Sequence, residues 1–335
     1  MPLFNDTILH KLALYARNAA LDAGIAAMRY YRQAFRHAPV LGSGSNPSTE
    51  ADIQATLAAL NSLGNTLHQL DPDYRVYGEE LDTDYSKEMV KQRMNIELPF
   101  LRNSANVVRS GAEFISGFPG HISVLMDGID GTTNFRAGLP IFCSAIAVYV
   151  DGCLRVGAVY DPHHHIVYYG VLPENDLPMA HIWHVASGEN PRLTTPKTER
   201  ELLIATHFTR GTDPQSTEKR AEMLQKTNQL MCRGNGHYQL NSGQLALTYV
   251  AAGILSGFVN NYTNPWDIAA AQVLIEAVGG CVTHFNGKRI DYNSVGKIDV
   301  LAAGTPAVHA ELQRLMSQPA AHIIGQPQTE LHSDA

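Results

Sequence analysis

The chain has 335 residues, of which 44% are hydrophobic and 17% charged, so it can bury a large core and is not a disordered protein. Its formal net charge of −7 argues against a nucleic-acid-binding surface. The sequence has no run of about 18 apolar residues and no secretory signal at its start, so we expect neither a membrane span nor export. The scattered cysteines include no C-x-x-C pair, which favours a reduced, cytoplasmic setting.

Two long helices are predicted near the start of the chain. Apolar residues recur at helical spacing over residues 6–35, and a second such pattern runs from about Thr49 to Leu70. Asp52 falls in the first turn of the second helix. Taken alone, it is an acidic residue that stabilises the positive end of the helix dipole.

The next stretch contains a short predicted strand and a long segment whose role the sequence does not define. Tyr74 to Tyr77 reads as a strand that ends in Gly78-Glu79-Glu80, and such an acidic turn is by itself usually solvated. Residues 81–120 include a possible helix from Met89 to Leu101. The segment is a candidate lid, substrate-selecting flap or oligomer contact, and the sequence does not distinguish between these.

The apolar run from Ile122 to Met126 predicts a buried strand, and acidic residues follow it directly. Asp127 and Asp130 stand three residues apart in a glycine-rich turn. Their carboxylates can converge on a hard cation, with the Ile129 carbonyl as a further oxygen ligand. This stretch therefore predicts a metal site.

The residues after this turn suit the start of a helix, because Thr132, Thr133 and Asn134 are small and polar. The amides of Gly131 and Thr132, at the head of that helix, can bind a phosphate. A metal beside a phosphate is the arrangement that metal-assisted phosphoryl chemistry requires.

The remaining elements follow from local patterns. Residues 163–165 are three histidines, which we interpret as a solvated hairpin tip, with metal binding as the less favoured alternative, because consecutive side chains point in different directions. Residues 171–200 read as a polar loop. The other predicted strands are 142–150, 154–160, 166–170, 202–206 and 298–302, and the other predicted helices are 214–230 and 305–316.

A second informative motif is NPWDIAAAQVLIEAVGG, residues 264–280. Pro265 precedes a helix whose first turn contains Asp267. Without further context, Asp267 would be read as the residue that caps this helix.

Together these motifs resemble those of the inositol monophosphatase family, the magnesium-dependent, lithium-sensitive phosphatases. MDGIDGTTNF resembles the family's first signature, D-P-I-D-G-T-T-N-F, and residues 264–280 resemble the second. The GEE sequence at 78–80 also matches, and the resemblance covers roughly residues 6–316. Gly128 replaces the proline of the first signature, which we expect to loosen the turn without removing a ligand.

The resemblance implies an α/β fold, the αβαβα sandwich of the sugar phosphatases. It also implies an N-terminal half with the metal site, residues 1–180, a C-terminal half, residues 181–316, and a polar tail, residues 317–335. We further expect a homodimer.

The resemblance assigns roles to individual residues. Two or three Mg²⁺ ions, with Mn²⁺ as an alternative, would be held by a set of oxygen ligands: Glu79, Asp127, the Ile129 carbonyl, Asp130 and Asp267. Catalysis would rest on three side chains that position or deprotonate the attacking water: Glu79, Asp52 and Thr132, the last two as a contacting pair. Substrate contacts would come from Gly131, Thr132, Asp130, Ser242 and Asn260.

The implied function is hydrolysis of a small sugar or polyol phosphate, with inositol monophosphate as the first candidate. Fructose-1,6-bisphosphatase or 3′(2′),5′-bisphosphate nucleotidase activity is the alternative. Asn260 stands where the family often has a glutamate that contacts substrate hydroxyls, so this chain should tolerate a second anionic group there. A non-catalytic binding protein is a third hypothesis, disfavoured because all the carboxylate ligands are present.

Overall fold

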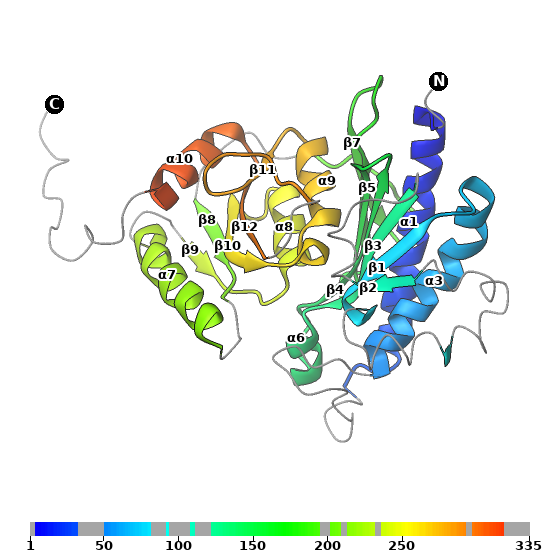
Figure 1. Ribbon diagram of the computed structural model, residues 1–335, viewed down its shortest axis with the longest axis horizontal. Coiled ribbons are helices and arrows are strands. Elements are labelled where there is room, and N and C mark those ends of the chain that lie inside the picture. Colours follow the sequence, from blue (N-terminus) through cyan, green and yellow to red (C-terminus); the bar gives the residue numbers. More distant parts are fainter. Residues whose placement is uncertain are drawn as a thin grey trace, which may run out of the picture.

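The computed structural model describes residues 4–32, 50–81, 92–93, 108–110, 122–194, 202–208, 213–231, 236–292 and 297–317. Across these ranges the helices and sheets stack in alternating layers, with helices on both outer faces and between the two sheets (Figure 1). This arrangement confirms the predicted αβαβα sandwich. None of the helices within the described ranges is long and apolar enough to cross a bilayer.

Two helices form the outer layer on the N-terminal side. They are α1 (Asp6–Met28) and α3 (Glu50–Leu70), and both pack on the same sheet (Figure 1). The buried face of α1 is rich in alanine, and a Cβ at Gly24 would lie 2.3 Å from the Tyr160 ring. These small residues let α1 lie close to the sheet. The helix ends at Met28, earlier than predicted.

The first sheet has the strand order β2-β1-β3-β4-β5-β6-β7. Every residue of β3 is buried, because helices cover both faces of the sheet at this strand. The bounds of the strands are β1 Arg75–Gly78, β2 Val108–Ser110, β3 Ile122–Asp130, β4 Cys143–Val150, β5 Cys153–Asp161, β6 Ile166–Val171 and β7 Met179–His184.

The prediction that residues 171–200 form a loop is wrong at β7. Most residues of this strand are only partly buried, and its sequence, MAHIWH, lacks a continuous apolar run. Its extended conformation is stabilised by pairing with β6 on one side and by hydrogen bonds to the segment 189–193 on the other. Neither interaction is visible in the local sequence.

The middle layer consists of α8 (Gly243–Ala251) and α9 (Ala269–Ala277), which lie between the two sheets (Figure 1). The contact between α9 and β5 is very close at Gly157, where a Cβ would lie 2.1 Å from the Ala270 carbonyl oxygen. The glycine is therefore required for this packing distance.

The second sheet has the order β11-β12-β10-β8-β9 and carries two helices on its outer face (Figure 1). The strands and helices that were predicted in this region are confirmed. Three strands were not predicted: β10, and the three-residue strands β9 and β11. The elements are β8 Leu203–Thr206, α7 Pro214–Met231, β9 Gly236–Tyr238, β10 Gly257–Thr263, β11 Cys281–Thr283, β12 Ile298–Ala303 and α10 Pro306–Ser317.

Three predictions about chain organisation are not tested. Only Gln92 and Arg93 of the possible helix 89–101 fall within the described residues, and the tail beyond Ser317 lies outside them. The division into two halves at residue 180 stays a prediction.

Candidate active site

The carboxylates of Asp127 and Asp130 both lie on β3, which continues through the predicted turn. Opposite them on β4, Asp127 pairs with Ala145 and Asp130 with Cys143, so three steps along β3 match two along β4. The extra residue is a β-bulge. In a regular strand, side chains three residues apart face opposite sides of the sheet. The bulge turns Asp127 and Asp130 to the same side. The prediction that the strand ends at Met126 is therefore wrong, and the bulge makes the two carboxylates converge.

Gly128 lies inside this bulge, directly against α3. A Cβ at this position would lie 3.0 Å from the Ala55 Cβ and 3.1 Å from both the Asp52 carbonyl oxygen and the Thr56 hydroxyl. The Gly128 carbonyl accepts a 2.6 Å hydrogen bond from the Ser144 hydroxyl. The position is closely packed, in contrast to the loosening expected from the loss of proline.

The chain turns from β3 into the short helix α6 (Thr132–Ala137) at Gly131, whose φ of 97° favours glycine. The Thr132 hydroxyl lies 3.2 Å from Asp52 Oδ1 and 3.0 Å from the Ile129 carbonyl oxygen, so it can donate to either. Asp52 is fully buried. The predicted contact between Asp52 and Thr132 is confirmed.

Asp130 is held by the N-terminus of α8. The Ser242 hydroxyl and the Gln244 amide donate to its Oδ2 at 2.6 and 2.7 Å, and the Gly243 amide donates to Oδ1 at 3.2 Å. Ser242 thus lies behind Asp130, and the cavity described below is lined by Asn241 instead. A substrate contact by Ser242 stays a prediction, whereas its support of Asp130 is direct.

Asp267 ends the 3-10 turn η3 (Pro265–Asp267), which precedes α9. Its Oδ2 accepts hydrogen bonds from the Thr263 hydroxyl at 3.0 Å, the Asn264 amide at 2.9 Å and Asn264 Nδ2 at 3.2 Å. Asn264 is the capping residue and Asp267 is the third residue of a capping box. These bonds fix the orientation of the Asp267 carboxylate.

The side chain of Gln244 joins the segments that carry Asp130 and Asp267. Its Nε2 donates to the Trp266 carbonyl at 2.6 Å, and its Oε1 accepts from the Ala271 amide at 2.9 Å. Since its own amide donates to Asp130, one buried residue sets the distance between two carboxylates from different layers.

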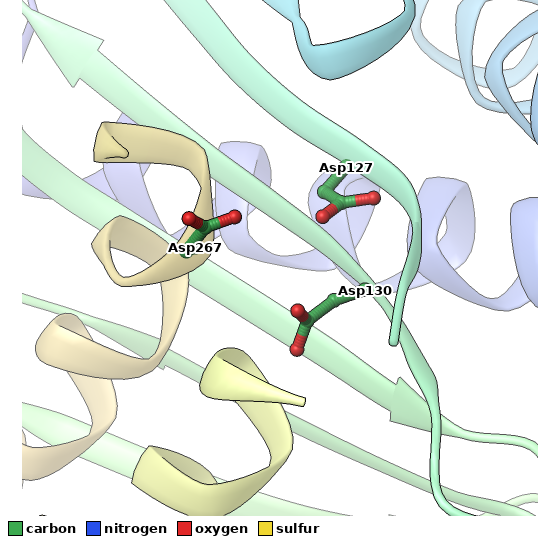
Figure 2. Close-up of side chains that lie close together, drawn as sticks. All are labelled: Asp127, Asp130 and Asp267. Carbon is green, nitrogen blue, oxygen red and sulfur yellow. The ribbon is translucent and has the colours of Figure 1, made fainter. Parts of the chain in front are cut away.

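The result is a group of three carboxylates from two layers of the fold. One oxygen each of Asp127, Asp130 and Asp267 lie within 4.8 Å of one another, and Figure 2 shows the side chains facing a common space. Asp127 Oδ1 accepts from the Ile129 amide at 2.9 Å, but its Oδ2 is buried and has no hydrogen-bond partner. A buried carboxylate oxygen without a donor fits a cation ligand, because burying it unpaired is otherwise costly.

This group opens into a cavity of about 250 Å³. Of the residues predicted for the site, Glu79, Gly131, Thr132 and Asn260 also line it, whereas Asp52 lies behind Thr132. Glu79, in the 3-10 turn η1 (Glu79–Leu81), is outside the tight group of three. Sequence reasoning missed several lining residues, since no motif marks them: His207, Phe208, Asp213, Ser216, Tyr262 and Lys297.

Burial and mutual repulsion disfavour the charged forms of these carboxyls. Burial and then the charges of neighbours, first Asp130, raise the pKa of Asp127 well above its usual range. Burial and the charge of Asp127 do the same to the pKa of Glu79. For Asp130, burial and Asp267 raise the pKa to about 6, against the opposing effect of the hydrogen bonds from α8. The ionised cluster therefore destabilises the cation-free fold.

In a chelator at pH 8, Asp127→Asn is expected to be more stable than the wild type, by about 1 kcal/mol or about 2–4 °C in Tm. An acid whose pKa is raised by folding costs stability progressively above its unfolded pKa and in full above the raised value, so the gap should narrow once the pH falls below the raised value and should close near about pH 4. Thermal unfolding of both proteins in EDTA from pH 8 to pH 4 measures this. A lower Tm for the variant at pH 8 would contradict the described electrostatics.

The histidines of the β5–β6 hairpin contact different groups. His163 packs edge-on against Tyr31 and Phe142, with ring centroids 4.8 and 5.2 Å away. His164 Nδ1 lies 2.7 Å from a carboxylate oxygen of the buried Asp161. Within the described ranges, the only group of side chains with metal-ligand geometry is the one formed by the three aspartates.

Comparison with known proteins gives a consistent result. A family model described as the inositol monophosphatase family matches residues 9–319. The Nus factor SuhB of Pasteurella multocida is 33% identical over 178 residues, which cover 53% of this chain and 61% of that protein, less than two thirds of its length. The fructose-1,6-bisphosphatase/inositol-1-monophosphatase of Thermotoga maritima is 29% identical over 60% of this chain and 70% of its own.

Solved structures share the fold over a longer span. The extragenic suppressor protein suhB from Bartonella henselae superposes with a TM-score of 0.68 over 92% of this chain and 99% of its own. The sequence identity of that pair is 20%, so the likeness concerns the fold alone.

Proposed function

The chain belongs to the inositol monophosphatase family, and from this premise we propose that it is a metal-dependent phosphomonoesterase acting on a small sugar or polyol phosphate. Inositol monophosphate is the first candidate substrate. The observation that carries the proposal is the convergence of Asp127, Asp130 and Asp267 at the wall of a cavity, with Asp127 Oδ2 buried and without a hydrogen-bond donor.

The donor set fits Mg²⁺, because the group consists of carboxylate oxygens, which hard cations prefer. Asp127, Asp130 and Asp267 would hold one ion. Glu79, Asp127 and the Ile129 carbonyl would hold a second. When bound, such ions lower the pKa of a water molecule and neutralise charge on a phosphate.

The protein's own residues supply orientation and proton transfer. The Thr132 hydroxyl can donate to Asp52, which leaves its lone pairs to accept a hydrogen bond from the attacking water. Glu79 lines the cavity, from where its carboxylate can position or deprotonate the attacking water. The amides of Gly131 and Thr132 would bind the phosphate oxygens, and Asn260 would face the rest of the substrate.

Activity is expected to require Mg²⁺ and to be inhibited by submillimolar to millimolar Li⁺. Phosphate release from inositol 1-phosphate, fructose 1,6-bisphosphate and an adenosine 3′,5′-bisphosphate should be measured with Mg²⁺, Mn²⁺ and excess chelator. Full activity in the chelator would contradict the assigned ligands. The panel also separates the monophosphatase from the bisphosphatase and nucleotidase alternatives.

A non-catalytic role is the second candidate, favoured by the name Nus factor that the Pasteurella relative carries. It predicts no phosphate release from any ester of the panel, although metal would still bind. The expected absence of a nucleic-acid partner, the homodimer and the cytoplasmic setting stay predictions.

A further inference from the structure

Part of the cavity wall is built by the second sheet. Asn260 and Tyr262 lie on β10, and Lys297 stands immediately before β12. Because Thr263 pairs with Ile298 across these antiparallel strands, Lys297 comes close to the end of β10. All three residues line the same cavity as the aspartates.

The Lys297 side chain is exposed, and its ammonium has no ion-pair partner among the described residues. It hydrogen-bonds to Asn264 Oδ1 and lies 5.4 Å from the centre of the Tyr262 ring. Both contacts are with uncharged groups. An ammonium has three N–H donors, so donors remain for a ligand in the cavity.

Asn260 adds donors to this wall. Its Oδ1 accepts a 3.0 Å hydrogen bond from the Tyr262 amide, and a backbone N–H can bond only to the oxygen of the side-chain amide. The NH₂ group therefore points away from that bond, and the residue is otherwise buried. A glutamate would present negative oxygens at this place, whereas Asn260 presents N–H donors.

Asp213 also lines the cavity, and its carboxylate is hydrogen-bonded to the start of α7. Both oxygens of Asp213 accept from Ser216, at 2.9 Å from its amide and 2.5 Å from its hydroxyl, and thereby cap α7. Among the described residues, Asp213 therefore forms its hydrogen bonds within its own helix start and no ion pair with Lys297.

We propose that Lys297 and Asn260 form a subsite for a second anionic group, so that a phosphate ester bearing another phosphate or a carboxylate gains a contact that the matching monophosphate lacks. This inference rests on the proposed function, since the scissile phosphate is placed at the aspartates. Lys297 acts as a specificity-determining residue.

The test compares substrates that differ only in the second group. Fructose 1,6-bisphosphate is paired with fructose 1-phosphate, and 3-phosphoglycerate with glycerol 3-phosphate, which distinguishes a second phosphate from a carboxylate. For each pair the ratio of kcat/KM is measured with Mg²⁺ in the wild type and in Lys297→Met. The ratio should fall about tenfold in the variant for at least one pair, the value of one charge-assisted hydrogen bond.

Lys288→Met is the matched control, because it removes the same charge from an exposed lysine that does not line the cavity. Its ratios should equal those of the wild type. Ratios that stay unchanged in Lys297→Met while the monoesters are hydrolysed would overturn the subsite and leave the phosphatase proposal intact.

A binding measurement covers the case in which no ester is hydrolysed and the proposed function fails. Calorimetric titration of the same proteins with fructose 1,6-bisphosphate and fructose 1-phosphate, in Mg²⁺, then decides the question. Preferential binding of the bisphosphate that is lost in Lys297→Met supports the subsite, and equal binding of the two sugars overturns it.

Discussion

Asp127→Asn is expected to lower kcat/KM for phosphate ester hydrolysis by more than about 100-fold. Replacing a residue that only supports a metal ligand already lowers activity by about 10- to 100-fold, and Asp127 is proposed to be a ligand itself. Asp127 contributes the buried oxygen that has no hydrogen-bond donor. The variant keeps the side-chain oxygen that accepts from the Ile129 amide, so the bulge should keep its shape. Steady-state kinetics with Mg²⁺, together with a Tm, measures the effect.

Asp52→Asn is the comparison variant. Asp52 does not line the cavity and hydrogen-bonds with Thr132, which does, so the loss of activity should lie within about 10- to 100-fold. Mg²⁺ titration of both variants adds a second readout, since only Asp127→Asn should weaken the apparent metal affinity strongly. Equal losses of activity in two folded variants would refute the distinction between a ligand and a residue that orients water.

Gly157→Ala is expected to lower the free energy of unfolding by about 1–3 kcal/mol, the usual cost of overpacking a core. The added Cβ would lie 2.1 Å from the backbone oxygen of Ala270, so β5 and α9 would have to separate. Since α9 directly follows Asp267, we also expect weaker Mg²⁺ binding. Denaturant unfolding and Mg²⁺ titration measure the two effects.

Gly236→Ala is a matched control for this substitution. Its Cβ would meet the ends of the Leu203 and Tyr238 side chains, at 3.0 and 3.1 Å, and these can rotate away. Its destabilisation should be clearly smaller than that of Gly157→Ala. A cost equal in the two variants would show that α9 and β5 are free to move apart.

Much of the fold was predictable from sequence because the responsible signals are local. Each of three patterns predicts the element in which it lies: the alanine face of α1, the apolar runs of β4 and β5, and the amphipathic pattern of α10. β7 was missed because its conformation depends on pairing with β6 and on the segment 189–193, both of which are tertiary interactions.

For the candidate site, too, local signals were visible in the sequence and tertiary ones were not. Asp127, Asp130 and Asp267 lie in motifs that announce their chemistry, and the structure brings them together. The bulge that makes Asp127 and Asp130 converge was not visible, since a strand and a turn give similar local patterns there. Lys297 was missed because only the register between β10 and β12 brings it to the cavity.

The close packing of Gly128 limits the order in which this chain can change during evolution. Reverting to the proline of the related signature would add ring atoms where even a Cβ lies 3.0–3.1 Å from three groups of α3. Proline at 128 would thus require α3 to shift outward slightly or to lose bulk at Ala55 or Thr56. We therefore expect the cost of this substitution to depend on which residues α3 carries at these two positions, so that the two segments constrain each other's sequence.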